Sequence, residues 1–159
     1  MKGSTPAPKS GERIAFYGTL MRGLGGLDEL GIEGELRYLG PCSCAGALHD
    51  LGAYPGLVAS PPEPRSTDRV QGELFEILDV RIMATLDAFE GFDPDSPDDS
   101  LYIREYAELL EPAGERAWLY LYNQPLPTPD PAATRIDDGD WRSHVAKTRG
   151  SGNSRPNTA

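Results

Sequence analysis

The sequence has few cysteines and histidines, which limits the kinds of metal or redox site that it can build. Among its 159 residues are two of each. The cysteines, Cys42 and Cys44, are separated by a single residue, a spacing that suits neither an ordinary disulfide framework nor a complete zinc site. We interpret both as reduced strand residues and predict no metal site, with metal binding by the pair as the weaker alternative.

Basic residues are also scarce, and no long hydrophobic run is present. Fifteen Lys and Arg residues face 25 Asp and Glu residues, which gives a formal net charge of −10. Binding nucleic acid calls for a basic surface, so we expect no nucleic-acid partner. No apolar run approaches the roughly 20 residues of a membrane span, and residues 1–12 lack the apolar segment of a secretory signal. We therefore expect a cytoplasmic protein with no membrane partner.

The length favours one domain with a buried core. We place this domain at residues 13–147. The flanking segments, 1–12 and 148–159, are polar and contain the Pro, Gly, Ser and Asn residues typical of disordered tails.

Strand patterns dominate the chain, with one clear helix among them. We expect strands at 14–17 and 70–77, two more between 33 and 48 that are separated at Gly40-Pro41, and a hairpin from 101 to 122 that turns at 112–114. A short helix should follow the glycines at 23–26. Strands that outnumber helices in this way favour an α+β fold, a mixed β-barrel flanked by a few helices, over repeated βαβ units.

The most informative stretch is Phe16-Tyr17-Gly18-Thr19-Leu20, where the first buried strand ends. Glycine at a strand end allows a ligand to approach the main chain, and successive N–H groups beyond it can form a concave anion site. The same pattern also fits a strand that simply ends in a turn. A nucleotide-binding loop at 23–27 is excluded, because position 28 is Asp and no Gly-Lys-Ser/Thr follows.

The clear helix, at 79–90, carries an acid on its apolar side. Asp79 is a suitable N-cap and Gly91 a suitable terminator. Glu90 lies four residues after Leu86, so it falls on the apolar stripe. Partial burial and the negative end of the helix dipole both disfavour the ionised carboxyl, which makes it a better proton acceptor near neutral pH. Pairing with another side chain, or exposure at the helix end, would also explain an acid at this position.

Together these stretches resemble the γ-glutamylcyclotransferase-like family, in particular its γ-glutamylamine cyclotransferase branch. The resemblance rests on Tyr17-Gly18-Thr19-Leu20-Met21-Arg22-Gly23 and Leu86-Asp87-Ala88-Phe89-Glu90-Gly91. Weaker marks between about 13 and 145 occur in the expected order: Ala53-Tyr54-Pro55-Gly56, Val70-Gln71-Gly72-Glu73-Leu74-Phe75, Tyr102-Ile103-Arg104, Trp118-Leu119-Tyr120-Leu121-Tyr122 and Gly139-Asp140-Trp141.

The resemblance implies an enzyme that closes a γ-glutamyl amide to 5-oxoproline and releases the amine. It implies Glu90 as the general acid/base. It also implies that main-chain groups of the first motif hold the glutamyl part, and these belong to Tyr17, Gly18, Thr19 and Leu20. The substrate's own α-amine is the nucleophile, so the reaction needs no cofactor and no Ser–His or Cys–His pair.

Two alternatives remain open from the sequence. Tyr102 occupies the family's Tyr-x-Arg position, where its hydroxyl could contact the substrate or simply point into water. The protein could also be a binding or regulatory module that keeps the pocket without turnover, because a fold does not fix a function. The acidic loop at 93–99 does not match a calcium loop, and we interpret it as solvated.

Overall fold

The computed structural model describes residues 7–52, 54–59, 64–66, 68–126 and 134–148. Its strands and helices follow one another as β1 Arg13–Phe16, α1 Gly26–Leu30, the 3-10 turn η1 Glu33–Glu35, β2 Leu36–Cys44, β3 Ala47–Asp50, β4 Pro55–Val58, β5 Val70–Ile77, α2 Ile82–Glu90, the 3-10 turn η2 Pro97–Asp99, β6 Tyr102–Glu108, β7 Arg116–Tyr122, β8 Arg135–Ile136 and α3 Trp141–Thr148.

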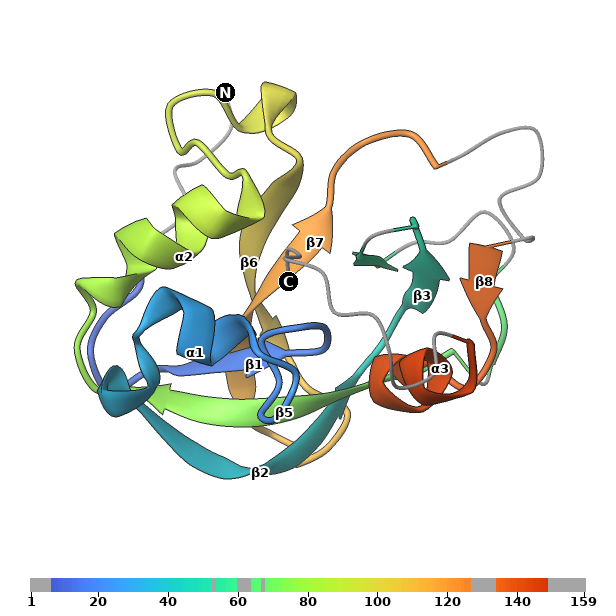
Figure 1. The fold of residues 1–159 in the computed structure, drawn as a ribbon, viewed down its shortest axis with the longest axis horizontal. Coiled ribbons are helices and arrows are strands. Elements are labelled where there is room, and N and C mark those ends of the chain that lie inside the picture. Colours follow the sequence, from blue (N-terminus) through green and yellow to red (C-terminus); the bar gives the residue numbers. More distant parts are fainter. Residues whose placement is uncertain (1–6, 53, 60–63, 67, 127–133, 149–159) are drawn as a thin grey trace.

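A five-stranded sheet of order β2-β5-β1-β7-β6 forms the body of the protein, and a three-stranded sheet of order β4-β3-β8 stands beside it. Neighbouring strands pair antiparallel except β1 and β7, which are parallel. The larger sheet curls from β2 and β5 up to β7 and β6, with α1 and α2 on one side of the molecule and α3 beside β8 on the other (Figure 1). The α+β prediction is confirmed; among the described residues the sheet is curved but not closed.

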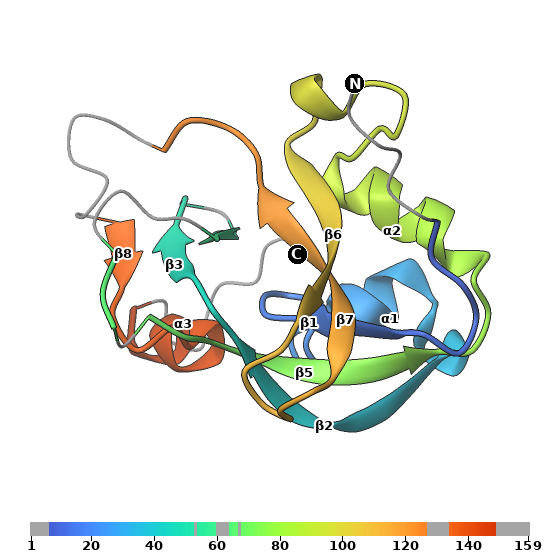
Figure 2. The same ribbon diagram turned by 180° about the vertical axis from the view of Figure 1, so that it is seen from behind.

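The core fills the inside of this curled sheet. Strand β7 shows the effect most clearly, because Ala117, Trp118, Leu119, Tyr120 and Leu121 are all buried. Successive side chains of a strand point to opposite faces, so Ala117, Leu119 and Leu121 lie on one face and Trp118 and Tyr120 on the other. Both faces are buried, because the sheet is curved and other elements pack on it. Figure 2 shows the same sheet from behind.

Two predicted boundaries were wrong. The strand predicted to break at Gly40-Pro41 continues to Cys44, and the register shifts between Tyr38 and Gly40. Gly40 has a φ of 131°, which glycine adopts without strain, so it forms a bulge in the strand rather than its end. The chain turns only at 45–46 before β3 begins.

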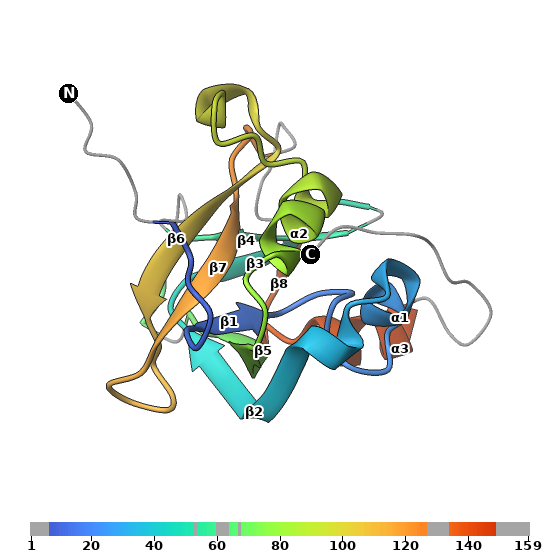
Figure 3. The same cartoon turned by 90° about the vertical axis from the view of Figure 1, so that its left-hand side faces the viewer.

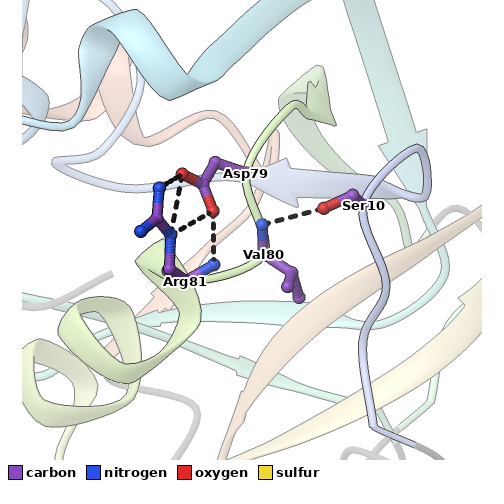
Figure 4. Close-up of polar contacts among 4 residues, drawn as sticks. All are labelled: Ser10, Asp79, Val80 and Arg81. Carbon is purple, nitrogen blue, oxygen red and sulfur yellow. Dashed lines mark hydrogen bonds and ion pairs between the residues drawn. The ribbon is translucent and has the colours of Figure 1, made fainter.

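The clear helix begins later than predicted, at Ile82 instead of Asp79. The Asp79 carboxylate accepts a hydrogen bond from the backbone N–H of Arg81 (3.0 Å) and pairs with its guanidinium at 2.7 Å. The Val80 N–H donates to Ser10 Oγ at 3.0 Å (Figure 4). These contacts form a turn ahead of the helix, because a short acidic side chain that bonds its own backbone two residues on competes with helical geometry. The end of α2 is as predicted: Gly91 has a left-handed φ of 71°.

The domain boundaries remain a prediction, since 1–6 and 149–159 lie outside the described residues. Within the expected N-terminal tail, the Gly11 N–H donates to the Ile77 carbonyl at 2.7 Å. Glu12 accepts a 2.9 Å hydrogen bond from the indole of Trp118. Residues 11 and 12 therefore contact the large sheet. No helix in the part of the chain that the structure describes is long and apolar enough to cross a membrane.

Candidate active site

The site centres on Glu90, the last residue of α2. The helix turns Ile82, Met83, Leu86 and Glu90 to its buried face, so the predicted place of Glu90 on the apolar stripe is confirmed. Its exposed fraction is 0%. The alternative in which this acid reaches water at the helix end is wrong. Figure 3 views the protein from the side on which α2 lies nearest the reader.

Tyr17, the first residue after β1, lies close to Glu90 inside the protein. Its hydroxyl donates to the Tyr120 carbonyl at 2.7 Å and accepts from the Leu57 N–H at 3.3 Å. Burial raises the pKa of the Tyr17 phenol well above its ordinary value, and the neighbouring Tyr102 and Glu90 raise it further. Tyr17 is therefore a neutral residue that fixes its own backbone, because its hydroxyl is already committed to main-chain partners.

The loop after Tyr17 is buried and tightly folded. Gly18 and Leu20 are buried, and Thr19 is 6% exposed. The Gly18 carbonyl accepts from the Met21 N–H at 3.0 Å, and the Thr19 carbonyl accepts from the Gly26 N–H at 3.1 Å. A side chain at Gly26 would lie 2.7 Å from the Thr19 carbonyl oxygen, so only glycine lets α1 pack against the loop here.

Glu73, on β5, holds the other end of this loop. One of its carboxylate oxygens accepts from the Arg22 N–H at 2.7 Å, and the other lies 3.1 Å from the guanidinium of Arg142 and 3.4 Å from that of Arg22. The side chain of Glu73 is 11% exposed. Sequence reasoning did not place Glu73 in the site. The available signal was an acid followed directly by Leu74 and Phe75 within a strand.

Tyr102 is fully buried at the start of β6, and its hydroxyl donates to the Pro55 carbonyl at 2.6 Å. The alternative with this hydroxyl in water is wrong. Tyr102 stacks edge-on against Tyr54 and Tyr122, and it contributes to the raised pKa of Tyr17. The structure thus brings Tyr17, Tyr102 and Glu90 into one neighbourhood, although the contact of Tyr102 with a substrate remains a prediction.

Asp87 forms a polar cluster one turn before Glu90. Its Oδ1 accepts from the Tyr120 hydroxyl at 2.6 Å and lies 2.8 Å from Nε of Arg104. Arg104 is therefore an ion-pair partner of Asp87. Burial raises the pKa of the Tyr120 phenol well above its ordinary value, and Asp87 and Glu90 add to this shift.

Cys42 and Cys44 are free, buried residues of β2, as predicted. Burial raises the pKa of each thiol to about 12. Within the described residues, no group of three or more His, Cys, Asp or Glu side chains is arranged to hold a metal ion. The acids of the loop at 93–99 are exposed to solvent.

Most of this chain matches one known protein family. The family described as gamma-glutamyl cyclotransferase, AIG2-like, matches residues 14–143. A Vibrio cholerae protein named "Putative gamma-glutamylcyclotransferase" is 36% identical over 99 residues, which are 62% of this chain and 69% of that protein.

Two solved structures share the fold at lower identity. An uncharacterized protein from Pyrococcus horikoshii is 19% identical with a TM-score of 0.60, over 89% of this chain and 99% of that one. An AIG2-like protein from Mus musculus is 22% identical with a TM-score of 0.57, over 82% and 88% of the two chains. Since the family match spans both the loop at 17–20 and the helix that ends at Glu90, the chain belongs to the AIG2-like gamma-glutamyl cyclotransferase family.

Proposed function

We propose that this protein is a cyclotransferase that converts a γ-glutamyl amide or amine conjugate to 5-oxoproline and a free amine, with Glu90 as the general acid/base. One observation carries the proposal: a fully buried carboxyl at the end of α2 lies near Tyr17, where the loop that follows β1 begins. A protein interior rarely holds an acid without a partner or a chemical task. Family membership favours the task of proton transfer.

The reaction begins at the substrate's α-ammonium group, which must lose a proton before it can attack. Glu90 accepts that proton, and the free amine then attacks the γ-carbonyl carbon to form the new C–N bond. As the old amide bond breaks, the departing nitrogen receives a proton from Glu90. Over the whole reaction the α-nitrogen loses two protons and the departing nitrogen gains two, so the enzyme returns to its starting state.

The loop of Tyr17, Gly18, Thr19 and Leu20 would bind the glutamyl part through main-chain groups. Its fold supports this role, because Tyr17 is fixed at its hydroxyl and the loop carbonyls at 18 and 19 are hydrogen-bonded within the protein. Backbone N–H donors that are already held in place can stabilise the charge that develops in the transition state, because they need not reorganise first. A fixed loop also restrains the flexible glutamyl chain near its cyclising geometry. Tyr102 would line the same space.

The leaving amine is the least defined part of the proposed substrate. The loop at 93–99 carries exposed Asp93, Asp95, Asp98 and Asp99 and begins three residues after Glu90. A negative rim would favour a leaving amine with extra positive charge, whereas aspartates that serve only solubility would show no such preference. Screening over about 8–10 Å confines any such effect to low ionic strength.

The test is to incubate the purified protein with γ-glutamyl amines, including γ-glutamyl-putrescine, and with γ-glutamyl-alanine, and to measure 5-oxoproline directly. We expect 5-oxoproline and the free amine in equal amounts from at least one of them, without added metal or cofactor. Saturable binding of these compounds without any product would instead identify a binding module on the same fold. If these compounds neither bind nor yield 5-oxoproline, the assignment of the substrate class is contradicted.

A further inference from the structure

Tyr120 joins the two parts of the proposed site. Its side-chain hydroxyl donates to Asp87 on α2 at 2.6 Å, and its main-chain carbonyl accepts from the Tyr17 hydroxyl at 2.7 Å. Tyr120 therefore contacts both the helix that carries Glu90 and Tyr17, the first residue of the loop at 17–20. A displacement of β7 would be transmitted to both.

Asp87 attaches α2 to the paired strands β6 and β7. Arg104 and Tyr120 are directly opposite each other in the β6–β7 register, and both approach the same oxygen of Asp87. Asp87 and Glu90 are three residues apart, so they lie one above the other on the buried face of the helix. This attachment fixes the rotation of the last helical turn, from which Glu90 projects.

We propose that Asp87 is a positioning residue, which acts with Arg104 and Tyr120 to hold the Glu90 carboxyl in its working orientation beside Tyr17. This inference rests on the proposed function, because it assigns the network a role in that reaction. Asp87 does not touch the substrate in this scheme. It acts through the helix and through Tyr120.

The cluster is well shielded from water, so its charges matter. The side chains of Arg104 and Asp87 are 11% and 12% exposed, and the Arg104 guanidinium lies over the ring of Phe92 at 4.9 Å. Removing the charge of Asp87 leaves a buried cation without its counterion, which shifts the structure around it. A loss of precise orientation at Glu90 should lower the rate of proton transfer more than it weakens substrate binding.

The charge balance also predicts a direction for the pH profile. Among the described residues, the neutral phenols of Tyr17 and Tyr120 interact with Glu90, and Tyr102 adjoins Tyr17. The Asp87 carboxylate lies on the same helix, and the Arg104 guanidinium on β6 pairs with Asp87. Changing Asp87 to Asn removes a negative charge and keeps the positive one. The Glu90 carboxyl should therefore ionise at a lower pH, and the acid limb of the pH–rate profile should move to lower pH.

The experiment compares Asp87→Asn and Tyr120→Phe with a matched control, Asp68→Asn. Asp68 pairs with Arg135, and their side chains are 13% and 6% exposed, so this ion pair is buried to a similar degree. It connects the segment before β5 to β8, on the opposite side of the molecule from α2 in Figures 1 and 2. The control therefore reports what the loss of a buried ion pair does by itself.

For Asp87→Asn we expect kcat to fall at least tenfold with KM changed less than threefold, and the acid limb to move to lower pH. Tyr120→Phe should lower kcat less and leave the limb in place, because it removes a hydrogen bond but no charge. Asp68→Asn should keep kcat within about twofold, whatever its melting temperature. Equal losses of kcat in Asp87→Asn and Asp68→Asn, or no loss in a folded Asp87→Asn protein, would overturn the proposal.

A measurement that does not depend on turnover separates this inference from the proposed function. Carbon-13 NMR of the Glu90 side-chain carboxyl, assigned with Glu90→Gln, follows its titration in wild type and in Asp87→Asn. We expect a titration midpoint at lower pH and a changed chemical shift in the variant. An unchanged Glu90 signal refutes the positioning role even in an active enzyme. A changed signal in a protein that makes no 5-oxoproline refutes only the proposed reaction.

Discussion

The hydroxyl of Tyr17 donates a 2.7 Å hydrogen bond to the backbone carbonyl of Tyr120, 103 residues further along the chain. This bond connects the loop after β1 to the strand that supports α2. Because the carbonyl belongs to the main chain, no substitution at position 120 removes the acceptor itself. The bond can be broken only from Tyr17 or by moving β7.

Replacing Glu90 with Gln tests the proton-transfer role most directly. Glutamine keeps the shape of the buried side chain but cannot shuttle a proton, so we expect turnover to fall at least about a hundredfold. The far-UV spectrum and the binding of a γ-glutamyl compound should be retained. Near-normal production of 5-oxoproline by this variant would contradict the assignment.

Replacing Gly18 with Val tests the main-chain loop. The residue is buried, and a branched side chain would occupy the space that we assign to the glutamyl group. We expect weaker binding of a γ-glutamyl amine by calorimetry. Gly34→Val is a suitable control, because a side chain at Gly34 would meet no atom within 4 Å. Equal affinities in folded Gly18→Val and in wild type would remove the loop from the site.

Replacing Glu73 with Gln should loosen the far end of the same loop. The change removes the negative charge that holds the Arg22 N–H and two guanidinium groups. A charge-assisted hydrogen bond of about 1.5 kcal/mol corresponds to roughly tenfold in affinity, so KM should rise severalfold with a smaller change in kcat.

The matched control for this change is Glu76→Gln on the same strand. Glu76 pairs with Arg37 on the edge strand β2. Its KM should stay close to that of wild type. A similar rise in both variants would show that the effect comes from the stability of β5 rather than from the loop.

From the burial of the two cysteines we predict that the protein becomes less stable at alkaline pH. Burial raises the pKa of Cys42 and Cys44 to about 12 in the folded protein, from an ordinary value of about 9. The thiols are neutral in both states below pH 9, so their contribution to stability is complete there. Between about pH 9 and 12 the unfolded chain loses these protons more readily, and the free energy of unfolding falls.

Two measurements check this prediction. At pH 8 a thiol reagent should leave both cysteines unmodified in the folded protein and modify both in denaturant. Between pH 8 and 10.5, a Cys42→Ala/Cys44→Ala protein should lose less stability than wild type. Rapid modification of the native protein would show that the thiols are accessible and ionisable, contrary to the structure.

The sequence by itself determined the local features of this site. The periodic apolar residues of α2 placed Glu90 on its buried face, and Gly91 ended the helix as predicted, because helical spacing and glycine's left-handed conformation are local properties. The strand at 70–77 and the hairpin of β6 and β7 followed from alternation and turn residues in the same way. The α+β class followed from the order of these elements.

The tertiary structure decided what those local features contact. Glu73 lies 51 residues from Arg22, and Asp87 lies 33 residues from Tyr120, so neither pairing could be read from spacing within one element. Competition between local and long-range contacts also set two boundaries. The Asp79 carboxylate accepts a hydrogen bond from the Arg81 N–H, and the helix begins only after this turn. Pairing with β5 continues on both sides of the bulge at Gly40, so β2 does not end there. Spacing along a strand or helix can assign a residue to a face, but only packing selects the partner that the face meets.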